Sequence, residues 1–214
     1  MRIGVVADTH VGEHLPALPA EVLERLDGVD LILHAGDVSV PRVLDELGEI
    51  APVAAVRGNH DGGALRRLPR DLVVPAGGAR IGLTHGTRPV RVELSSGFVS
   101  LVAGRPVLLG FHRAMVRRFH EVDLVVTGHL HMSMDLVVDG VRLFSPGAVY
   151  VPEMTTFLEG RRTSAWAHRR YRRGLSDADR RPAIGLIEWG PTGLVTRRVV
   201  LERPIAVMRR RRPQ

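Results

Sequence analysis

Residues 2–10 have the sequence RIGVVADTH, in which an apolar, β-branched run leads directly into Asp8 and His10. A short apolar run that ends at polar residues is typical of a buried strand. The same order, a strand and then metal-binding or turn residues, occurs four more times along the chain. These later blocks are Gly36-Asp37, Gly58-Asn59-His60-Asp61, His85-Gly86 and Gly128-His129-Leu130-His131.

The first third of the chain alternates strand and helix signals, which predicts βαβ units and a partly parallel sheet. We expect strands over residues 3–7, 31–35, 52–56 and 124–127, and helices over residues 19–26, 41–47 and 111–120. Hairpins are predicted for residues 72–75 with 79–84, 133–138 with 141–145, and 183–189 with 194–201. Residues 88–110 fit neither a helical nor a strand period. The pattern favours an α/β fold of two sheets packed face to face, as a single domain over residues 1–214.

The composition restricts the class of protein. The chain has 214 residues, of which 44% are apolar, enough to bury one globular core. It has no cysteine, so any metal must be held by nitrogen and oxygen ligands. The first strand begins at once without a signal peptide, and no apolar run is long enough to cross a bilayer. We therefore expect a cytoplasmic protein without membrane contact.

The positive charge is concentrated in two segments. The formal net charge is +7, and every basic residue apart from histidine is arginine. We interpret residues 152–182 as a basic insertion and residues 208–214 as a basic, disordered tail. The insertion interleaves Trp166 and Tyr171 with arginines, a pattern that can hold nucleic acid weakly by phosphate contact and stacking. We favour the alternative, a solvated or partly disordered insertion whose Trp166 packs on the body of the domain. The arginines concerned are Arg161, Arg162, Arg169, Arg170, Arg172 and Arg173.

The five polar blocks are more informative together than singly. A D-x-H triplet or a G-D turn alone is a weak signal. All five follow strands, however, and sites in open α/β folds are built at strand ends. Carboxylate, amide and imidazole ligands suit divalent metals, and two adjacent metals are a common device for attacking phosphate esters.

The ordered series D-x-H, G-D, G-N-H-D, H-G and G-H-x-H resembles the calcineurin-like metallophosphoesterase family, in particular its small bacterial and archaeal phosphodiesterase branch. The resemblance covers roughly residues 1–150. It implies a four-layer α-β-β-α sandwich of two mixed sheets with a dimetal site at the strand ends. One departure is Thr87 after His85-Gly86, where small members often have a second histidine.

The resemblance also implies a role for each motif residue. One metal would be bound by Asp8, His10, Asp37 and His131. The second would share Asp37 as a bridge and add Asn59, His85 and His129. His60 would face the leaving group. Asp61, the second candidate catalytic residue, would orient either His60 or its loop, with a structural contact at a helix N-terminus as the alternative. The implied cofactors are two divalent metal ions, manganese first, with nickel, iron or zinc as alternatives.

The function that follows is a metallophosphoesterase that hydrolyses a small phosphate ester, a phosphodiester first, by a metal-bridging hydroxide. A phosphomonoesterase or phosphoprotein phosphatase would need the same ligands. A non-catalytic scaffold, as known for a retromer subunit that resembles the family, predicts eroded ligands. A nucleic-acid-binding module would use residues 161–173. Outside the motifs, we expect His34 to be a hydrogen-bonded core residue and weigh a substrate contact for His14.

Overall fold

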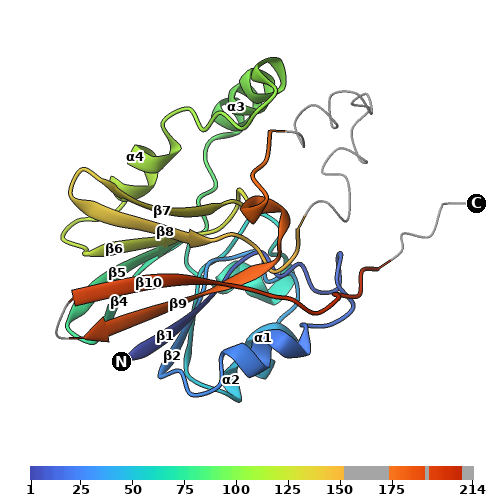
Figure 1. Ribbon diagram of the computed structural model, residues 1–214, viewed down its shortest axis with the longest axis vertical. Coiled ribbons are helices and arrows are strands. Elements are labelled where there is room, and N and C mark those ends of the chain that lie inside the picture. The colour runs from blue at the N-terminus through green and yellow to red at the C-terminus, as the bar shows by residue number, and fades with distance from the viewer. Residues whose placement is uncertain (152–173, 191–192, 209–214) are drawn as a thin grey trace, which may run out of the picture.

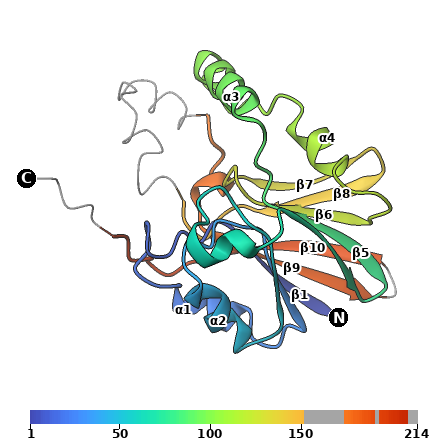
Figure 2. The same ribbon diagram turned by 180° about the vertical axis from the view of Figure 1, so that it is seen from behind.

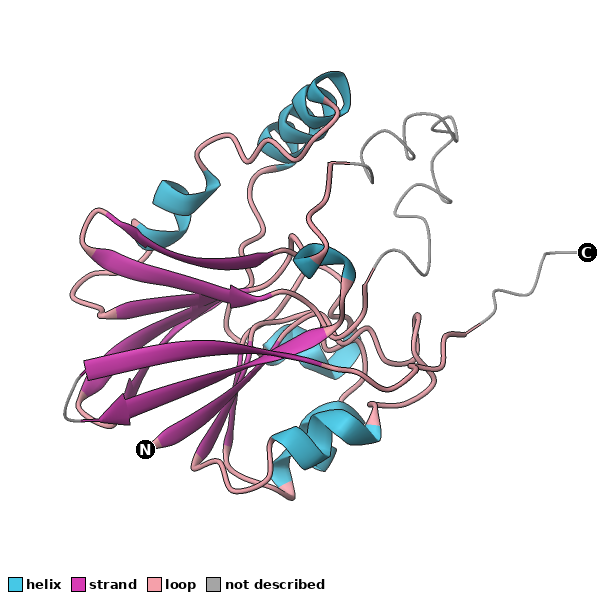
Figure 3. Cartoon of the chain, in the orientation of Figure 1, coloured by secondary structure: helices cyan, strands magenta, loops and turns pink. Residues whose placement is uncertain are grey.

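The computed structural model describes residues 1–151, 174–190 and 193–208, and its strands form two five-stranded mixed sheets (Figures 1 and 3). The first sheet has the order β10-β9-β1-β2-β3 and the second β4-β5-β6-β8-β7. The strands of the first sheet are β1 (Arg2–Val6), β2 (Leu31–His34), β3 (Val53–Ala55), β9 (Ala183–Gly190) and β10 (Gly193–Val200). Those of the second are β4 (Asp71–Ala76), β5 (Ala79–Thr84), β6 (Leu124–Thr127), β7 (Ser133–Val138) and β8 (Val141–Pro146).

Each sheet has a parallel centre and antiparallel edges. β1 runs parallel to β2, and β2 to β3, while β9 and β10 form an antiparallel hairpin beside β1. In the second sheet β5, β6 and β8 are parallel, and β4 and β7 flank them antiparallel. The βαβ alternation and the predicted hairpins of the second sheet are therefore confirmed.

Side-chain alternation along the strands separates the core into layers. Val5 packs between the two sheets, whereas its neighbour Val6 packs under the first helices. In β8, Phe144 packs between the sheets and Leu143 packs under α4 (Phe111–Val116). Since successive side chains of a strand point to opposite faces, each sheet carries apolar residues on both sides. The helices α1 (Ala20–Arg25) and α2 (Arg42–Gly48) cover the first sheet, which confirms the α-β-β-α sandwich (Figures 1 and 2).

The unassigned region 88–110 contains the helix α3 (Val90–Ala103), which stands clear of both sheets (Figures 1 and 2). Its inward side is polar: Ser100 Oγ accepts the backbone N–H of Val107 at 2.9 Å. Its outward side is apolar, with Leu94 55% and Phe98 67% exposed. A helix that packs on a core usually has an apolar inner face and a polar outer face. Because α3 has the reverse, the spacing of its apolar residues did not predict a helix.

Two predicted basic segments are only partly described. Asp179, in the short 3-10 helix Ala178–Arg180, accepts the backbone N–H of Ser133 at 2.8 Å and ties residues 174–182 to the second sheet. The remainder of the predicted insertion, with all six of its candidate arginines, lies outside the described residues, as does the tail from residue 209. The single-domain assignment stays a prediction. Among the helices of the described segments, none is long and apolar enough to cross a bilayer.

Candidate metal centre

The seven predicted metal ligands follow the carboxyl ends of five parallel strands. β1 leads into Asp8 and His10, and β2 leads into Asp37. β3, β5 and β6 lead in the same way into the loops of the remaining four, which are Asn59, His85, His129 and His131. Because parallel strands end at the same edge of a sheet, both sheets deliver their polar loops to one edge of the sandwich.

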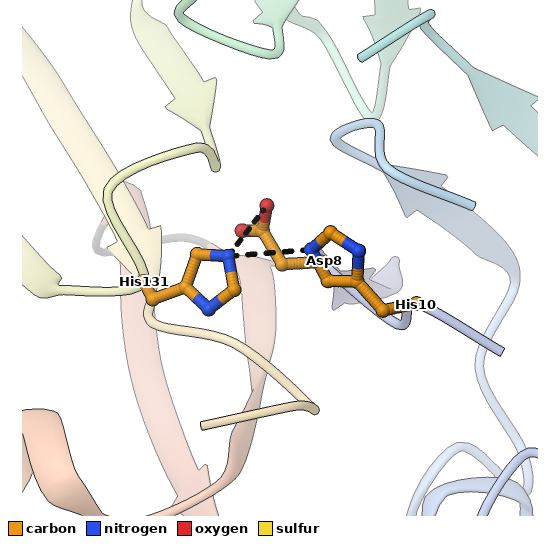
Figure 4. A group of neighbouring side chains, drawn as sticks. All are labelled: Asp8, His10 and His131. Atoms are coloured by element: carbon orange, nitrogen blue, oxygen red, sulfur yellow. Dashed lines mark hydrogen bonds and ion pairs between the residues drawn. The ribbon is translucent and has the colours of Figure 1, made fainter. Parts of the chain in front are cut away.

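Asp8, His10 and His131 form the first group of donor atoms (Figure 4). His131 Nε2 lies 3.5 Å from Asp8 Oδ1 and 3.4 Å from His10 Nε2. Two donors that bind one tetrahedral cation at roughly 2.0–2.1 Å lie about 3.4 Å apart. His131 Nδ1 is 2.8 Å from the carbonyl oxygen of Tyr150, to which it donates when protonated. That bond directs the Nε2 lone pair into the group, as is usual for a metal-binding imidazole.

Asp8, Asp37 and His85 form the second group. His85 Nε2 lies 3.3 Å from Asp37 Oδ2 and 3.0 Å from Asn59 Oδ1. On the other side of the ring, Nδ1 is 2.8 Å from the carbonyl oxygen of Ala35. The predicted second metal would therefore meet one imidazole, one amide oxygen and a shared carboxylate.

Asp37 lies between the two groups. Its Oδ2 is 3.3 Å from His85 Nε2 and 3.6 Å from His10 Nε2, so one oxygen faces the imidazoles of both groups. Its Oδ1 accepts the backbone N–H of His60 at 2.8 Å. This is the placement expected of a bridging carboxylate.

His129 is the outlying member of the predicted set. Its backbone N–H donates to Asp8 Oδ2 at 3.0 Å, and its ring centre is 5.0 Å from that of His85. Its Nε2 faces Glu93 Oε1 of α3 at 3.3 Å rather than the other donors. Nδ1 is therefore the nitrogen of His129 that is left for a metal.

The backbone at the site is strained. Five of the seven residues have φ values between 47° and 72°, a region that residues other than glycine rarely adopt. Such strain persists where the surrounding structure demands it and clusters at functional sites. The five are Asp8, His10, Asp37, His129 and His131. Gly58 also shapes the site: its backbone lies so close to the Asp37 carboxylate that a Cβ at this position would overlap it.

The charges of the site fit a cation. Burial raises the pKa of Asp8 to about 7, and the neighbouring Asp37 carboxylate adds to the shift. Burial is the largest single influence on Asp37 and disfavours its ionised form. The hydrogen bond and charge of His85, the charge of His10 and the backbone N–H of His60 together outweigh it and hold the pKa of Asp37 below its usual range. Burial is also the largest influence on His85 and opposes its charge, yet the hydrogen bond to Asp37 and the charges of Asp37 and Asp8 together raise the pKa of His85 to about 9. Two buried carboxylates among converging imidazoles form a donor set that suits divalent metals.

Two glutamates at the site were not predicted from the sequence. Glu13 Oε2 lies 3.2 Å from His10 Nδ1 and 2.9 Å from His60 Nδ1. Hydrogen bonds from these two imidazoles hold the pKa of Glu13 below its usual range. Glu93 faces His129 and also accepts from Arg88 Nε at 3.1 Å. Neither glutamate belongs to a motif, and Glu93 lies in the region without a period, so no sequence signal marks them.

His60 and Asp61, the two predicted catalytic residues, have different partners in the structure. The Asp61 carboxylate accepts the backbone N–H groups of Gly58 at 2.8 Å, Ser39 at 2.8 Å and Asp37 at 3.1 Å. It therefore orders the loops after β2 and β3, which is the loop role considered for Asp61; a catalytic role for Asp61 stays a prediction. The partner of the His60 ring is Glu13, and that hydrogen bond raises the pKa of His60 above its usual value.

The two other histidines considered from the sequence lie close to the centre. His34 is fully buried, and its Nε2 lies 3.3 Å from Thr9 Oγ1, which confirms a hydrogen-bonded core residue. Burial lowers the pKa of His34 to about 3. His14 stacks on Tyr150 with ring centres 4.4 Å apart and lies beside His10. A contact between His14 and a substrate stays a prediction.

Comparison with known proteins identifies relatives of this chain. The family model of the calcineurin-like phosphoesterase superfamily domain matches residues 1–160. Over 156 residues the chain is 31% identical to a protein named "Probable metallophosphoesterase" from Methanothermobacter thermautotrophicus, with 72% of this chain and 81% of the relative covered.

Solved structures share the fold. A structure described as a novel archaeal phosphodiesterase matches with a TM-score of 0.57 and 21% identity, over 94% of this chain and 100% of that one. Vacuolar Protein Sorting 29 from Cryptosporidium parvum matches with a TM-score of 0.61 and 18% identity, over 94% of this chain and 98% of that one.

Proposed function

The chain belongs to the calcineurin-like phosphoesterase superfamily, and we propose that it is an enzyme that hydrolyses the phosphodiester bond of a small ester with two divalent metal ions. Manganese is the first metal we propose, with nickel, iron or zinc as alternatives, because nitrogen and oxygen donors of this kind accept each of them. The cytoplasm is the proposed location.

One observation carries this proposal: Asp37 Oδ2 faces His10 of one donor group at 3.6 Å and His85 of the other at 3.3 Å. A carboxylate oxygen that lies between the imidazoles of two donor groups is placed to serve a cation in each of them. The intact set of seven ligand residues is also what a catalytic site needs and what a scaffold could lose.

Different residues of the site would hold the metals and protonate the leaving group. Bound metals would supply a water of lowered pKa and polarise the phosphate oxygens. The imidazoles of His131 and His85 are oriented by the carbonyl oxygens of Tyr150 and Ala35, so their Nε2 atoms point inward. His60 lies at the rim, 36% exposed, where it can protonate the oxygen of a departing alcohol.

The proposal is tested by removing metals with a chelator and restoring manganese, nickel, zinc and magnesium in turn. Hydrolysis of bis(4-nitrophenyl) phosphate and of 4-nitrophenyl phosphate is then measured with each metal. We expect hydrolysis of the diester that depends on added metal and is lost in Asp37→Asn. The matched control is Asp27→Asn, the same change on an exposed side chain, which should keep full activity.

The alternatives predict other outcomes of that assay. A preference for the monoester would favour a phosphomonoesterase or phosphoprotein phosphatase. Absence of hydrolysis with every metal would contradict an enzyme and favour a non-catalytic scaffold. The likeness to Vacuolar Protein Sorting 29 does not decide between the two, because it shows only a shared fold. Weak nucleic-acid contact through the arginines of residues 161–173 remains a separate proposal, which deletion of that segment tests.

A further inference from the structure

We propose that Glu13 is the positioning residue of this site: it holds His60 by Nδ1, so that His60 Nε2 is the atom presented to the leaving group. This inference rests on the proposed phosphodiester hydrolysis and deepens it. It places the hydrogen-bond partner of the proton donor His60 in the loop of Glu13, which belongs to none of the sequence motifs.

The contacts of His60 carry the inference. Both oxygens of the Glu13 carboxylate lie near His60 Nδ1, Oε2 at 2.9 Å and Oε1 at 3.0 Å. A carboxylate only accepts hydrogen bonds, so His60 Nδ1 must carry the proton in this pair. The ring is thereby fixed in one orientation and Nε2 is left for another partner.

The loop of Glu13 is built to hold this position. Gly12 adopts φ +83°, and its N–H donates to the carbonyl oxygen of Leu15 at 2.7 Å, closing a tight turn. The Glu13 N–H donates to the carbonyl oxygen of His10 at 3.2 Å. Val11 and Leu15 are fully buried on either side and anchor the turn in the core. The carboxylate therefore starts from a backbone with little freedom.

Glu13 also joins His60 to the first donor group. Its Oε2 lies 3.2 Å from His10 Nδ1, and the rings of His10 and His60 meet edge to face with centres 4.8 Å apart. A carboxylate on the outer nitrogen of a ligating imidazole fixes the orientation of that ring. One side chain thus sets the relative placement of a metal ligand and the proton donor.

The chemical step uses this arrangement without any further reactant. Water attacks phosphorus, the bond from phosphorus to the leaving oxygen breaks, and its electron pair goes to that oxygen. His60 starts with protons on both ring nitrogens; the oxygen takes the proton from Nε2 and departs as an alcohol, which leaves a neutral ring with its proton on Nδ1. The attacking water gives its proton to solvent, and the His60 imidazole regains one from solvent.

The test uses methyl aryl phosphodiesters whose leaving phenols differ in acidity, from 4-nitrophenol to phenol. A proton donor matters most for the poorest leaving group. We expect His60→Ala and Glu13→Gln to reduce kcat on methyl phenyl phosphate by at least about tenfold, with a much smaller loss on methyl 4-nitrophenyl phosphate. The double variant should be no slower than His60→Ala alone, because both changes interrupt one interaction.

Two further readouts separate this role from a structural one. The bound metal is measured by elemental analysis at a saturating metal concentration, where a weaker hold on His10 still leaves the sites filled, and Glu13→Gln should retain its full amount. Nitrogen-15 NMR of the zinc-loaded protein, which is diamagnetic, is recorded at a pH where the His60 ring is neutral, the form left after proton donation. It should show the proton on Nδ1 in the wild type and a mixture of tautomers in Glu13→Gln. Glu49→Gln, the same change on an exposed helix end, should match the wild type in every readout.

The possible failures are distinguishable. If the wild type hydrolyses no ester, the proposed function fails, and the NMR signal of His60 alone decides whether Glu13 pairs with it. Equal losses on all esters together with loss of metal would overturn the inference, since Glu13 would then act only through His10. Unchanged activity and an unchanged His60 signal in Glu13→Gln would also overturn it.

Discussion

The backbone N–H of His60 donates a 2.8 Å hydrogen bond to Asp37 Oδ1, which joins the loop after β3 to the loop after β2. Asp37 Oδ2 faces His85 and His10. The two oxygens of one carboxylate thus have different tasks, one in shaping the site and one toward the metals.

This division predicts the behaviour of Asp37→Asn. The amide oxygen can still accept the N–H of His60, so the variant should fold, but it lacks the charge to bridge two cations. A ligand that binds only the folded state raises the melting temperature. We expect manganese to raise the Tm of the wild type by several degrees and that of Asp37→Asn hardly at all, measured by differential scanning fluorimetry. An equal increase in both proteins would show that Asp37 does not bind metal.

The pH dependence of stability should differ between metal-free and metal-loaded protein. Burial raises the pKa of Asp8 from 3.8 to about 7. Between these pH values the folded protein holds a proton that the unfolded chain has released, so the contribution of Asp8 to stability falls as the pH rises. The raised pKa of His85, about 9 against 6.5, contributes stability that is complete below 6.5 and is lost as the pH rises through 9. Below about pH 6.5 the lowered pKa values of His34 and His131 have the opposite effect, because the unfolded chain binds protons that these buried rings do not. Metal-free protein should therefore lose stability with rising pH mainly between about 6.5 and 9.

Metals should oppose this loss, because their ligands bind in the deprotonated state and metal affinity rises with pH. The gap in Tm between manganese-loaded and chelator-treated protein should widen between about pH 5 and 8. Asp8→Asn should remove the opposing contribution of Asp8, so that metal-free stability rises more steeply between about pH 4 and 6.5 than in the wild type. A gap that is constant with pH would contradict the charge balance described for the site.

Glu93 should act on metal affinity through His129. Its Oε1 lies 3.3 Å from His129 Nε2, so Glu93→Gln removes the charge that orients this imidazole. Loss of such a partner typically costs about 10-fold to 100-fold in metal affinity, which a competition titration with a chromophoric chelator would measure. Arg88 also donates to the carbonyl oxygen of Leu108 at 2.8 Å, so the fold should survive.

The matched control for this variant is Glu188→Gln, the same change on an exposed strand residue, which should bind metal like the wild type. If Glu93→Gln binds both metals with unchanged affinity, the contact of α3 with His129 has no part in the metal centre.

Gly58 should not tolerate a side chain, since a Cβ at this position would overlap the Asp37 carboxylate. Gly58→Ala must displace Asp37 or the loop, and overpacking of this kind costs about 1–3 kcal/mol. We expect a lower midpoint of urea unfolding together with loss of metal. The control is Gly62→Ala in the same loop, where a Cβ would meet nothing within 4 Å. Equal effects of the two substitutions would contradict the close approach.

Most of the fold could be predicted because its signals are local. The apolar run before Asp8 and the hairpin turn at Asp139-Gly140 are each read from residues only a few positions apart in the sequence. The helix α3 could not be predicted, because Leu94 and Phe98 face outward and Ser96 and Ser100 face inward, the reverse of the usual pattern.

The sequence by itself determined which side chains could bind metal and that each follows a strand, because strand period and ligand chemistry are properties of short segments. Only the tertiary structure decided the partners. Glu13 and His60 are 47 residues apart, and Glu93 and His129 are 36 apart. Asp61 turned out to bind backbone N–H groups of two loops rather than His60. Such contacts depend on how loops from different strands pack at one sheet edge, which no local pattern encodes.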